Sequence, residues 1–120
     1  MPTMLVVDDQ QDLCDILARY FSARGFEVSS AFSGEEALHR MEARPPEVVL
    51  LDILLPGISG LEVLKRVRRA FPGTRVVMVT GTDRSDWRAE AKLFGACGFV
   101  TKPFQLSDNT WSAVFASGAA

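Results

Sequence analysis

The sequence is poor in the residues that build thiolate metal sites and disulfide frameworks. It holds two cysteines and one histidine in 120 residues, and Cys14 and Cys97 lie too far apart to match a metal or redox motif. We expect both to be reduced, buried thiols of a cytoplasmic protein. No apolar run approaches the roughly 18 residues that a membrane span requires. The first residues lack the basic and long apolar segments of a secretion signal, so neither a membrane contact nor secretion is expected.

The sequence also lacks a surplus of basic charge. Its 13 Lys and Arg residues stand against 15 Asp and Glu residues, which gives a net charge of −2. We therefore expect no direct nucleic-acid binding by this segment. The basic residues that do cluster, Lys65, Arg66, Arg68 and Arg69, are expected to form a solvated helix face. A hydrophobic content of 48% and this chain length fit one domain with a substantial core.

Short apolar runs alternate with segments of helical periodicity along the chain. Runs at residues 4–7, 26–29, 48–51, 76–79 and 98–101 predict strands, and each is followed by apolar residues at helical spacing. The last of the five helices is expected from Phe104 onward. Gly25 predicts a left-handed helix end, and Ser33 with Glu36 predicts a capping box. Five such units in this length indicate parallel strands joined by right-handed crossovers.

Polar residues stand directly after four of the apolar runs. They are Asp8 and Asp9 after the first run, Asp52 after the third, Thr80 at the end of the fourth and Lys102 after the fifth. Taken singly, an Asp at a strand end is often only a helix cap or turn residue. Taken together, they fall at the carboxyl ends of parallel strands, where open α/β sheets bind ligands. Their joint placement therefore favours one functional site.

Three carboxylates in one pocket require a cation or a proton. Two unit charges about 4 Å apart repel by roughly 4 kcal/mol at an effective dielectric near 20, and Lys102 offsets only part of the charge of Asp8, Asp9 and Asp52. The ligands are hard oxygens, with no histidine or thiol among them, and this favours Mg²⁺ or Mn²⁺ over zinc. Carboxylates, an ammonium and a hydroxyl together point to phosphoryl chemistry, with one carboxylate as the nucleophile.

At this point the chain resembles the receiver domain of a bacterial two-component response regulator. The motifs are Val-Asp-Asp at 7–9, Leu-Leu-Asp at 50–52, Leu-Pro-Gly at 55–57, Val-Thr-Gly at 79–81 and Thr-Lys-Pro-Phe at 101–104. The resemblance spans Met4 to about Leu106. It implies a flavodoxin-like (βα)5 three-layer α/β sandwich, whose five-stranded parallel sheet has the order 2-1-3-4-5. Residues 1–120 would form a single receiver domain, which either stands alone or is the N-terminal part of a longer regulator.

The resemblance also implies a phosphoacceptor and its metal site. Asp52 would accept a phosphoryl group from the phosphohistidine of a sensor histidine kinase. Asp9, Asp52 and the backbone carbonyl of Leu54 would bind Mg²⁺ directly, and Asp8 would hold it largely through water. The apolar Leu54 stands at a position that tunes dephosphorylation in this family. Because it cannot orient an attacking water, we expect slow self-dephosphorylation.

The remaining implied residues would read out the phosphoryl group. Lys102 would pair with it through a side chain placed by a cis Lys102–Pro103 bond, and Thr80 would swing to hydrogen-bond it. Phe99 would be the switch aromatic, turning inward when Thr80 moves. The face formed by the fourth helix, fifth strand and fifth helix would then repack to contact an output domain or a second copy. The chain would be a signalling switch that catalyses only its own phosphorylation and dephosphorylation.

Two other functions use the same architecture. A Mg²⁺-dependent phosphatase would also form an aspartyl phosphate, but Ile53, Leu54 and Leu55 after Asp52 supply no second carboxylate as a general acid. A flavin-binding module would need a loop rich in glycine and hydroxyl residues after the first strand. The Asp8-Asp9-Gln10-Gln11 stretch of this chain would repel a phosphate instead. The signalling switch is therefore the leading hypothesis.

Overall fold

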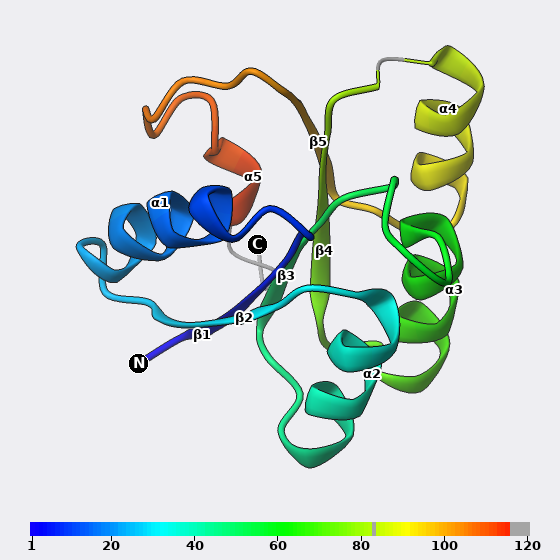
Figure 1. Cartoon of the computed structure of the whole chain (residues 1–120), viewed down its shortest axis with the longest axis horizontal. Coiled ribbons are helices and arrows are strands. Elements are labelled where there is room, and N and C mark those ends of the chain that lie inside the picture. Colours follow the sequence, from blue (N-terminus) through cyan, green and yellow to red (C-terminus); the bar gives the residue numbers. More distant parts are fainter. Residues whose placement is uncertain (83, 116–120) are drawn as a thin grey trace.

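The chain folds into one parallel β-sheet with helices on both faces, as seen in the computed structural model (Figure 1). The structure describes residues 1–82 and 84–115. The elements in chain order are β1 (Thr3–Val7), α1 (Gln11–Ser22), β2 (Glu27–Ala31), α2 (Gly34–Ala43), β3 (Val48–Leu51), α3 (Gly60–Ala70), β4 (Arg75–Thr80), α4 (Ser85–Leu93), β5 (Gly98–Thr101) and α5 (Ser112–Phe115).

The order of the strands is β2-β1-β3-β4-β5, and every neighbouring pair is parallel. This confirms the predicted sheet. The strand order changes direction at β1 and β3, so the carboxyl ends of these two strands flank the switch point at which such sheets hold ligands. Val7 stands opposite Leu51 in the register of β1 and β3. The residues that follow them, Asp8 and Asp52, therefore start from adjacent positions.

Alternate residues of the strands supply two separate apolar cores. On one face, the cluster that includes Leu5, Val49 and Met78 packs against α2, α3 and α4. On the other face, the cluster that includes Val6, Leu50 and Val77 packs against α1 and α5. Figure 1 shows α1 and α5 together on one side of the sheet and the other three helices on the opposite side. A sheet covered on both faces explains why its central strands are continuous apolar runs.

The capping signals in the sequence correspond to real helix ends. Ser33 Oγ accepts a hydrogen bond from the Glu36 backbone N–H at 3.1 Å. The Glu36 carboxylate reaches back to the N–H of Phe32, at 2.7 Å, one residue before the one that a standard capping box would use. Gly25 follows α1 with a φ of 93°, a backbone conformation that costs glycine little because it has no Cβ.

Two expectations for the second half of the chain are wrong. Helix α5 does not start at Phe104: within the described residues it covers only Ser112–Phe115, and the expected part beyond residue 115 lies outside them. Polar turn-forming residues compete with the helix in residues 104–111, where the Trp111 indole N–H donates to the Gln105 carbonyl at 3.0 Å. Cys97 is exposed, because it lies at the end of the sheet just before β5; only Cys14 is buried.

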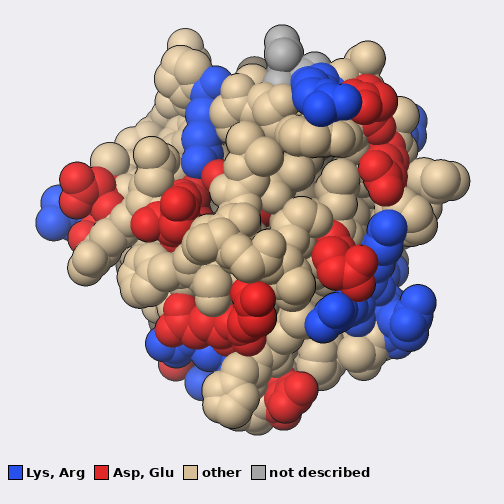
Figure 2. All heavy atoms as spheres, turned by 45° about the vertical axis from the view of Figure 1, so that its right-hand side comes forward, with Lys and Arg blue, Asp and Glu red and all other residues tan. Residues whose placement is uncertain are grey.

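The expectation of a solvated basic face on α3 holds for Arg66 and Arg69, which are exposed, whereas Lys65 and Arg68 are half-buried. Arg66 pairs with Glu62 at 3.0 Å, and Lys65 pairs with Glu90 of α4 at 3.8 Å. Figure 2 shows this side of the molecule, with basic and acidic side chains interspersed. The part of the chain that the structure describes contains no helix with the length and apolar character needed to cross a bilayer.

Candidate functional site

Backbone hydrogen bonds continue the sheet just beyond its carboxyl edge and place the polar residues there. The Asp52 N–H donates to the Val7 carbonyl at 3.1 Å, and the Asp8 N–H donates to the Ala31 carbonyl at 3.1 Å. On the other side of the sheet, the Lys102 N–H donates to the Thr80 carbonyl at 2.8 Å. The side chains of these residues therefore start from a rigid edge and not from a free loop.

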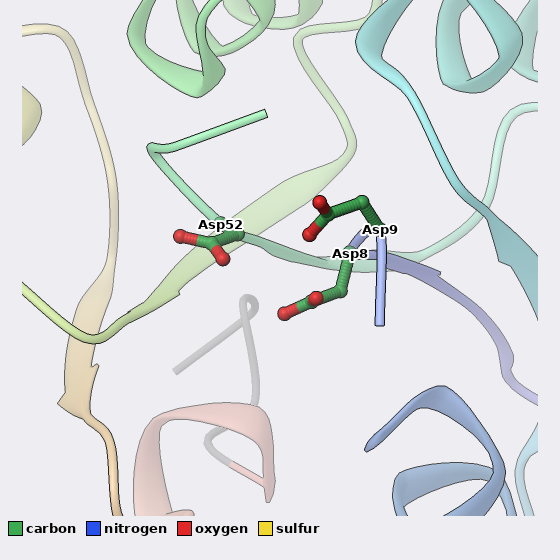
Figure 3. Close-up of side chains that lie close together, drawn as sticks. All are labelled: Asp8, Asp9 and Asp52. Carbon is green, nitrogen blue, oxygen red and sulfur yellow. The ribbon is translucent and has the colours of Figure 1, made fainter. Parts of the chain in front are cut away.

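Three carboxylates meet at this edge. Asp8, Asp9 and Asp52 each offer one oxygen atom, and these three atoms lie within 4.8 Å of one another. Figure 3 shows Asp8 and Asp9 facing Asp52 across the ends of β1 and β3. Asp8 and Asp52 are 3% and 6% exposed, whereas Asp9 is exposed. The cluster therefore has two buried carboxylates and one that faces solvent.

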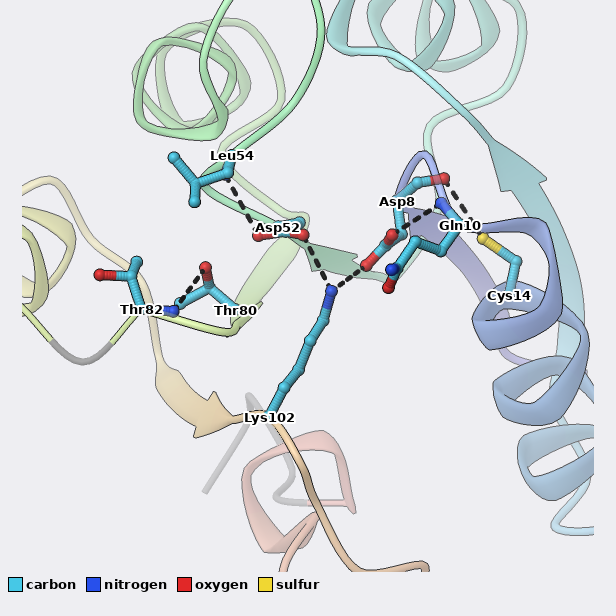
Figure 4. A network of polar contacts seen from close by, with 8 residues as sticks. All are labelled: Asp8, Gln10, Cys14, Asp52, Leu54, Thr80, Thr82 and Lys102. Carbon is cyan, nitrogen blue, oxygen red and sulfur yellow. Dashed lines mark hydrogen bonds and ion pairs between the residues drawn. The ribbon is translucent and has the colours of Figure 1, made fainter.

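Lys102 joins two of these acids from the opposite side of the pocket. Its ammonium Nζ lies 2.6 Å from Asp8 Oδ2 and 2.9 Å from Asp52 Oδ2, and both contacts are drawn in Figure 4. The Lys102 side chain is only 18% exposed. Hydrogen bonds between charged partners are shorter and stronger than neutral ones, so this ammonium is the main partner of both buried carboxylates.

Backbone N–H groups satisfy the second oxygen of each buried acid. The Gln10 N–H donates to Asp8 Oδ1 at 2.9 Å, and the Leu54 N–H donates to Asp52 Oδ1 at 3.1 Å. The two carboxylates are therefore fixed in orientation at both oxygens. Asp9 has no hydrogen bond or ion pair within residues 1–82 and 84–115. Its carboxylate is therefore the least restrained of the three.

Burial and pairing act against each other on the ionisation of the site. Burial raises the pKa of Asp8, although its hydrogen bonds with Lys102 and the Gln10 N–H favour the charged form. Burial alone would lower the pKa of Lys102, but its hydrogen bonds with Asp8 and Asp52 outweigh this, and the pKa of Lys102 is raised. The pocket thus favours the protonated form of Lys102 and disfavours the ionised form of Asp8.

The donor set fits a hard divalent cation. All three acids offer oxygens, and the pocket has two buried negative charges and one exposed one against a single ammonium. Mg²⁺ prefers carboxylate oxygens and water, and does not need a complete protein cage. The Leu54 backbone lies against the Asp52 carboxylate, and its side chain is 57% exposed. Whether the Leu54 carbonyl is a ligand stays a prediction.

Thr80 and Phe99 lie at the end of β4 and within β5. Thr80 is completely buried, and its Oγ1 accepts a hydrogen bond from the Thr82 N–H at 3.5 Å. Within the described residues it makes no hydrogen bond with Asp52, so it does not belong to the ion-paired cluster. Phe99 is half-buried, packs against the core under α4, and has the Arg88 guanidinium 4.8 Å from its ring centre. The peptide bond between Lys102 and Pro103 is cis, as expected.

The sequence reasoning missed two residues that shape the loop after Asp52. A Cβ on Gly60 would overlap the carbonyl oxygen of Asp52, so only glycine allows α3 to begin against this backbone. Glu35 of α2 reaches over the same loop and accepts the Ile58 N–H at 3.4 Å. The glycines of the loop were visible in the sequence, but the tertiary contact with Glu35 had no sequence signal.

Comparison with known proteins identifies the family and the fold. Residues 4–110 match the family model described as the response regulator receiver domain. The chain belongs to the response regulator receiver domain family. The expected resemblance is thereby confirmed, and the receiver domain is the unit that works as a phosphorylation-dependent switch in two-component signalling.

Curated relatives and solved structures agree with this assignment. The chain is 34% identical over 106 residues to the probable transcriptional regulatory protein TcrX of Mycobacterium tuberculosis, covering 88% of this chain and 45% of that protein. It is 35% identical over 110 residues to the phosphate regulon transcriptional regulatory protein PhoB of Rhizobium meliloti, covering 90% of this chain and 48% of that protein. The chain thus spans about half the length of these two relatives.

Two solved structures match nearly the whole receiver domain. The receiver domain of NtrX from Brucella abortus is 34% identical, with a TM-score of 0.84 and coverage of 95% of this chain and 99% of that one. A CheY-like receiver domain protein from Methanospirillum hungatei is 27% identical, with a TM-score of 0.90 and coverage of 96% and 92%. These similarities confirm the predicted α/β architecture. None of the four proteins is described as a phosphatase, the alternative that uses the same intermediate.

Proposed function

We propose that this receiver domain accepts a phosphoryl group on Asp52 and changes its contacts with partners when it does so. The observation that carries the proposal is the position of the Asp52 carboxylate. It is 6% exposed, hydrogen-bonded by Lys102 and the Leu54 N–H, and adjacent to two further acids. A buried carboxylate with a matched ammonium and a hard cation site is suited to act as a nucleophile toward phosphorus.

The transfer step forms one bond and breaks another. An Asp52 carboxylate oxygen bonds to the phosphorus of the donor, and the bond from phosphorus to the donor nitrogen of a phosphohistidine breaks. The imidazole leaves with its electron pair. The Lys102 ammonium, now shared by Asp8 and Asp52, can follow the charge onto the phosphoryl oxygens. Because Lys102 and the backbone donor are already in place, little reorganisation is needed at the moment of reaction.

A bound Mg²⁺ would neutralise negative charge on the carboxylates and on the incoming phosphoryl oxygens. In this proposal Asp9, Asp52 and the Leu54 carbonyl would hold the ion directly, and Asp8 would hold it largely through water. The exposed Asp9, which has no other partner in the described part of the chain, is the acid freest to turn toward it. Lys102 and the Leu54 N–H orient the Asp52 carboxylate, and its burial excludes most water from it.

The switch step uses the difference between the two states of Asp52. Phosphorylation brings a charge of about −1.5 to −2 and three strong acceptor oxygens. The Thr80 hydroxyl accepts a hydrogen bond from the nearby Thr82 N–H. It gains a better acceptor in the phosphorylated state alone, and a population shift requires such a differential contact. We infer that Phe99 then turns inward and that the face formed by α4, β5 and α5 repacks.

The partners follow from the same proposal. A sensor histidine kinase would supply the phosphoryl group in the cytoplasm. The curated relatives are about twice as long as the matched segment, which supports the proposal that this domain works as part of a longer regulator. The output domain, or a second copy of the chain, would contact the face of α4, β5 and α5. We propose a switch and not a turnover enzyme.

Incubation with a small phosphodonor tests the proposal. The 120-residue chain is mixed with acetyl phosphate and Mg²⁺ and measured by intact mass spectrometry. We expect the mass of one phosphoryl group to be added, and the addition to be lost in Asp52→Asn and in the presence of a chelator. Equal labelling of Asp52→Asn and the parent would contradict the proposal, as would a parent that stays unlabelled at saturating Mg²⁺.

A further inference from the structure

The loop between β3 and α3 lies over the site, and few contacts hold it. Residues 53–59 have no regular secondary structure, and they carry the Leu54 backbone beside Asp52. Ile53 is buried, whereas Leu54, Pro56 and Gly57 are exposed. One end of the loop is closed by the Gly60 N–H, which donates to the Ile53 carbonyl at 2.8 Å. The tip of the loop needs another restraint.

Glu35, in the first turn of α2, supplies that restraint. Its Oε2 accepts the Ile58 N–H at 3.4 Å. Within the described residues, this is the only hydrogen bond between residues 54–58 and a side chain from another element. The tip is otherwise held by apolar contacts, because Leu55 and Ile58 pack against the core cluster under α2 and α3.

The shape of the loop is matched to the Glu35 carboxylate. Gly57 has a φ of +76°, and a Cβ placed on it would lie 2.5 Å from Glu35 Oε2 and 2.7 Å from Oε1. The carboxylate therefore occupies the space that any other residue at position 57 would fill. One residue earlier in α2, a Cβ on Gly34 would overlap side-chain atoms of Ile58 and Val63. Two glycines thus bring the start of α2 and the loop into direct contact.

We propose that Glu35 is a positioning residue for the Mg²⁺ site, acting through the loop that carries Leu54. This inference rests on the proposed function, in which the Leu54 carbonyl is a metal ligand. When the loop tip moves, the Leu54 backbone cannot face the cation, and the apparent affinity falls in proportion to the fraction of competent molecules. Glu35 does not touch the cation or Asp52, so it is not a catalytic residue.

Replacing Glu35 tests the inference through Mg²⁺ affinity, measured by calorimetry on the 120-residue chain. Glu35→Ala removes the acceptor, and one lost hydrogen bond corresponds to an affinity about three- to tenfold weaker. Glu35→Gln keeps an acceptor oxygen, so its affinity should stay within about twofold of the parent. Glu42→Ala, at an exposed position of the same helix without a side-chain partner in the described structure, is the matched control and should leave the affinity unchanged.

A second measurement is independent of both metal and phosphate. Hydrogen exchange of the Leu54 amide, which is bonded to Asp52, should be at least about threefold faster in Glu35→Ala than in the parent. The amide of Leu51, within β3, should exchange at the parental rate. A variant that is merely less stable overall would speed both amides together, and this outcome would overturn the positioning role.

The outcomes separate this inference from the proposed function. A parent chain that binds no Mg²⁺ contradicts the proposed function and removes the premise of the inference. A parent that binds Mg²⁺ with the same affinity as Glu35→Ala overturns the inference alone. Equal weakening in Glu35→Ala and Glu35→Gln also overturns it, because the effect would then come from the charge of Glu35 and not from its hold on the loop.

Discussion

The ammonium of Lys102 lies 2.6 Å from the Asp8 carboxylate, across 94 residues of sequence. The same nitrogen also contacts Asp52, so one lysine at the end of β5 balances acids at the ends of β1 and β3. In the absence of a divalent cation this lysine is the principal counter-charge of the pocket. The two buried acids therefore rely on this lysine to balance their charge.

Loss of the ammonium should destabilise the metal-free protein. In Lys102→Met, Asp8 and Asp52 remain buried without their common partner, and charge-assisted hydrogen bonds of this kind contribute about 2 kcal/mol. We expect the free energy of unfolding in urea to be lower in Lys102→Met than in the parent by about this amount when a chelator is present. With Mg²⁺ the difference should be smaller. Lys92→Met, at an exposed position of α4, is the control and should change the free energy of unfolding by less than about 0.5 kcal/mol. Equal stability of Lys102→Met and the parent would contradict the role of the ammonium.

The contribution of Lys102 should also depend on pH. Hydrogen bonds with Asp8 and Asp52 raise the pKa of Lys102 above its ordinary value of about 10.5, against the effect of burial. The folded state therefore holds this proton more tightly than the unfolded chain. The stabilisation is fully present below pH 10.5 and is lost as the pH rises through the folded-state pKa. Unfolding measured up to pH 11 should show this decline in the parent and a shallower one in Lys102→Met.

Neutralising Asp8 should have the opposite effect on the metal-free protein. Burial raises the pKa of Asp8 above its ordinary value of about 3.8. Ionisation of this carboxyl therefore costs the folded state stability as the pH rises through that range. Asp8→Asn avoids this cost and should unfold at a higher temperature than the parent at pH 7. The advantage should disappear below about pH 3.8. A midpoint at pH 7 below that of the parent would contradict this, and Asp15→Asn on the exposed face of α1 controls for net charge.

The affinity for Mg²⁺ should fall at mildly acidic pH. A proton on Asp8 must leave before the carboxylate can hold the cation through water, and protons and metals compete for such groups. Since burial raises the pKa of Asp8, the fall should begin at a higher pH than for an exposed aspartate and approach about tenfold per pH unit for one proton. Calorimetric titration between pH 4 and 7 measures it. In Asp8→Asn the affinity should be weaker at pH 7 but less sensitive to pH.

Gly60 should be intolerant of a side chain. A Cβ at this position would overlap the backbone of Asp52, and forcing extra atoms into a packed region costs about 1–3 kcal/mol. Gly60→Ala should therefore lose stability and be phosphorylated more slowly, because Asp52 is displaced. Gly73→Ala is the control, since no atom lies within 4 Å of the Cβ it would add. If the two variants behave alike in urea unfolding and labelling, the close approach at Gly60 is unimportant.

Leu54 should lengthen the life of the phosphorylated state. Leu54 is apolar and 57% exposed, and it stands two residues after Asp52. It offers no group to orient a water molecule for attack on the phosphoryl group. Leu54→Asn should shorten the phosphate half-life several-fold, measured by the decay of the phosphorylated mass after the donor is removed. Comparable half-lives for the two proteins would refute this prediction.

The sequence predicted the sheet and the convergence of the site residues because both follow from simple regularities. Buried parallel strands give continuous apolar runs, and polar residues after such runs must meet at one edge of the sheet. Asp8, Asp52 and Lys102 meet because each follows a strand at this edge. Helix α5 was misplaced because its few apolar residues do not distinguish a helix from turns that bury Trp111.

The contacts that the sequence did not predict are tertiary contacts, which depend on how closely two elements approach each other. The Glu35 carboxylate meets Gly57 only because α2 and the loop after β3 approach each other closely at Gly34. No local pattern encodes that approach. The exposure of Cys97 was likewise unpredictable, because burial of a small residue at the start of a strand depends on which helix covers it.

The chemical identity of the modified side chain tests the central claim most directly. The chain is incubated with acetyl phosphate and Mg²⁺, treated with borohydride, which reduces an acyl phosphate to an alcohol, and mapped by peptide mass spectrometry. The account predicts the reduced side chain at Asp52 alone, with Asp8 and Asp9 unchanged. Reduction at Asp8 or Asp9, or a phosphoryl group that resists borohydride on a hydroxyl such as Thr80, would contradict it.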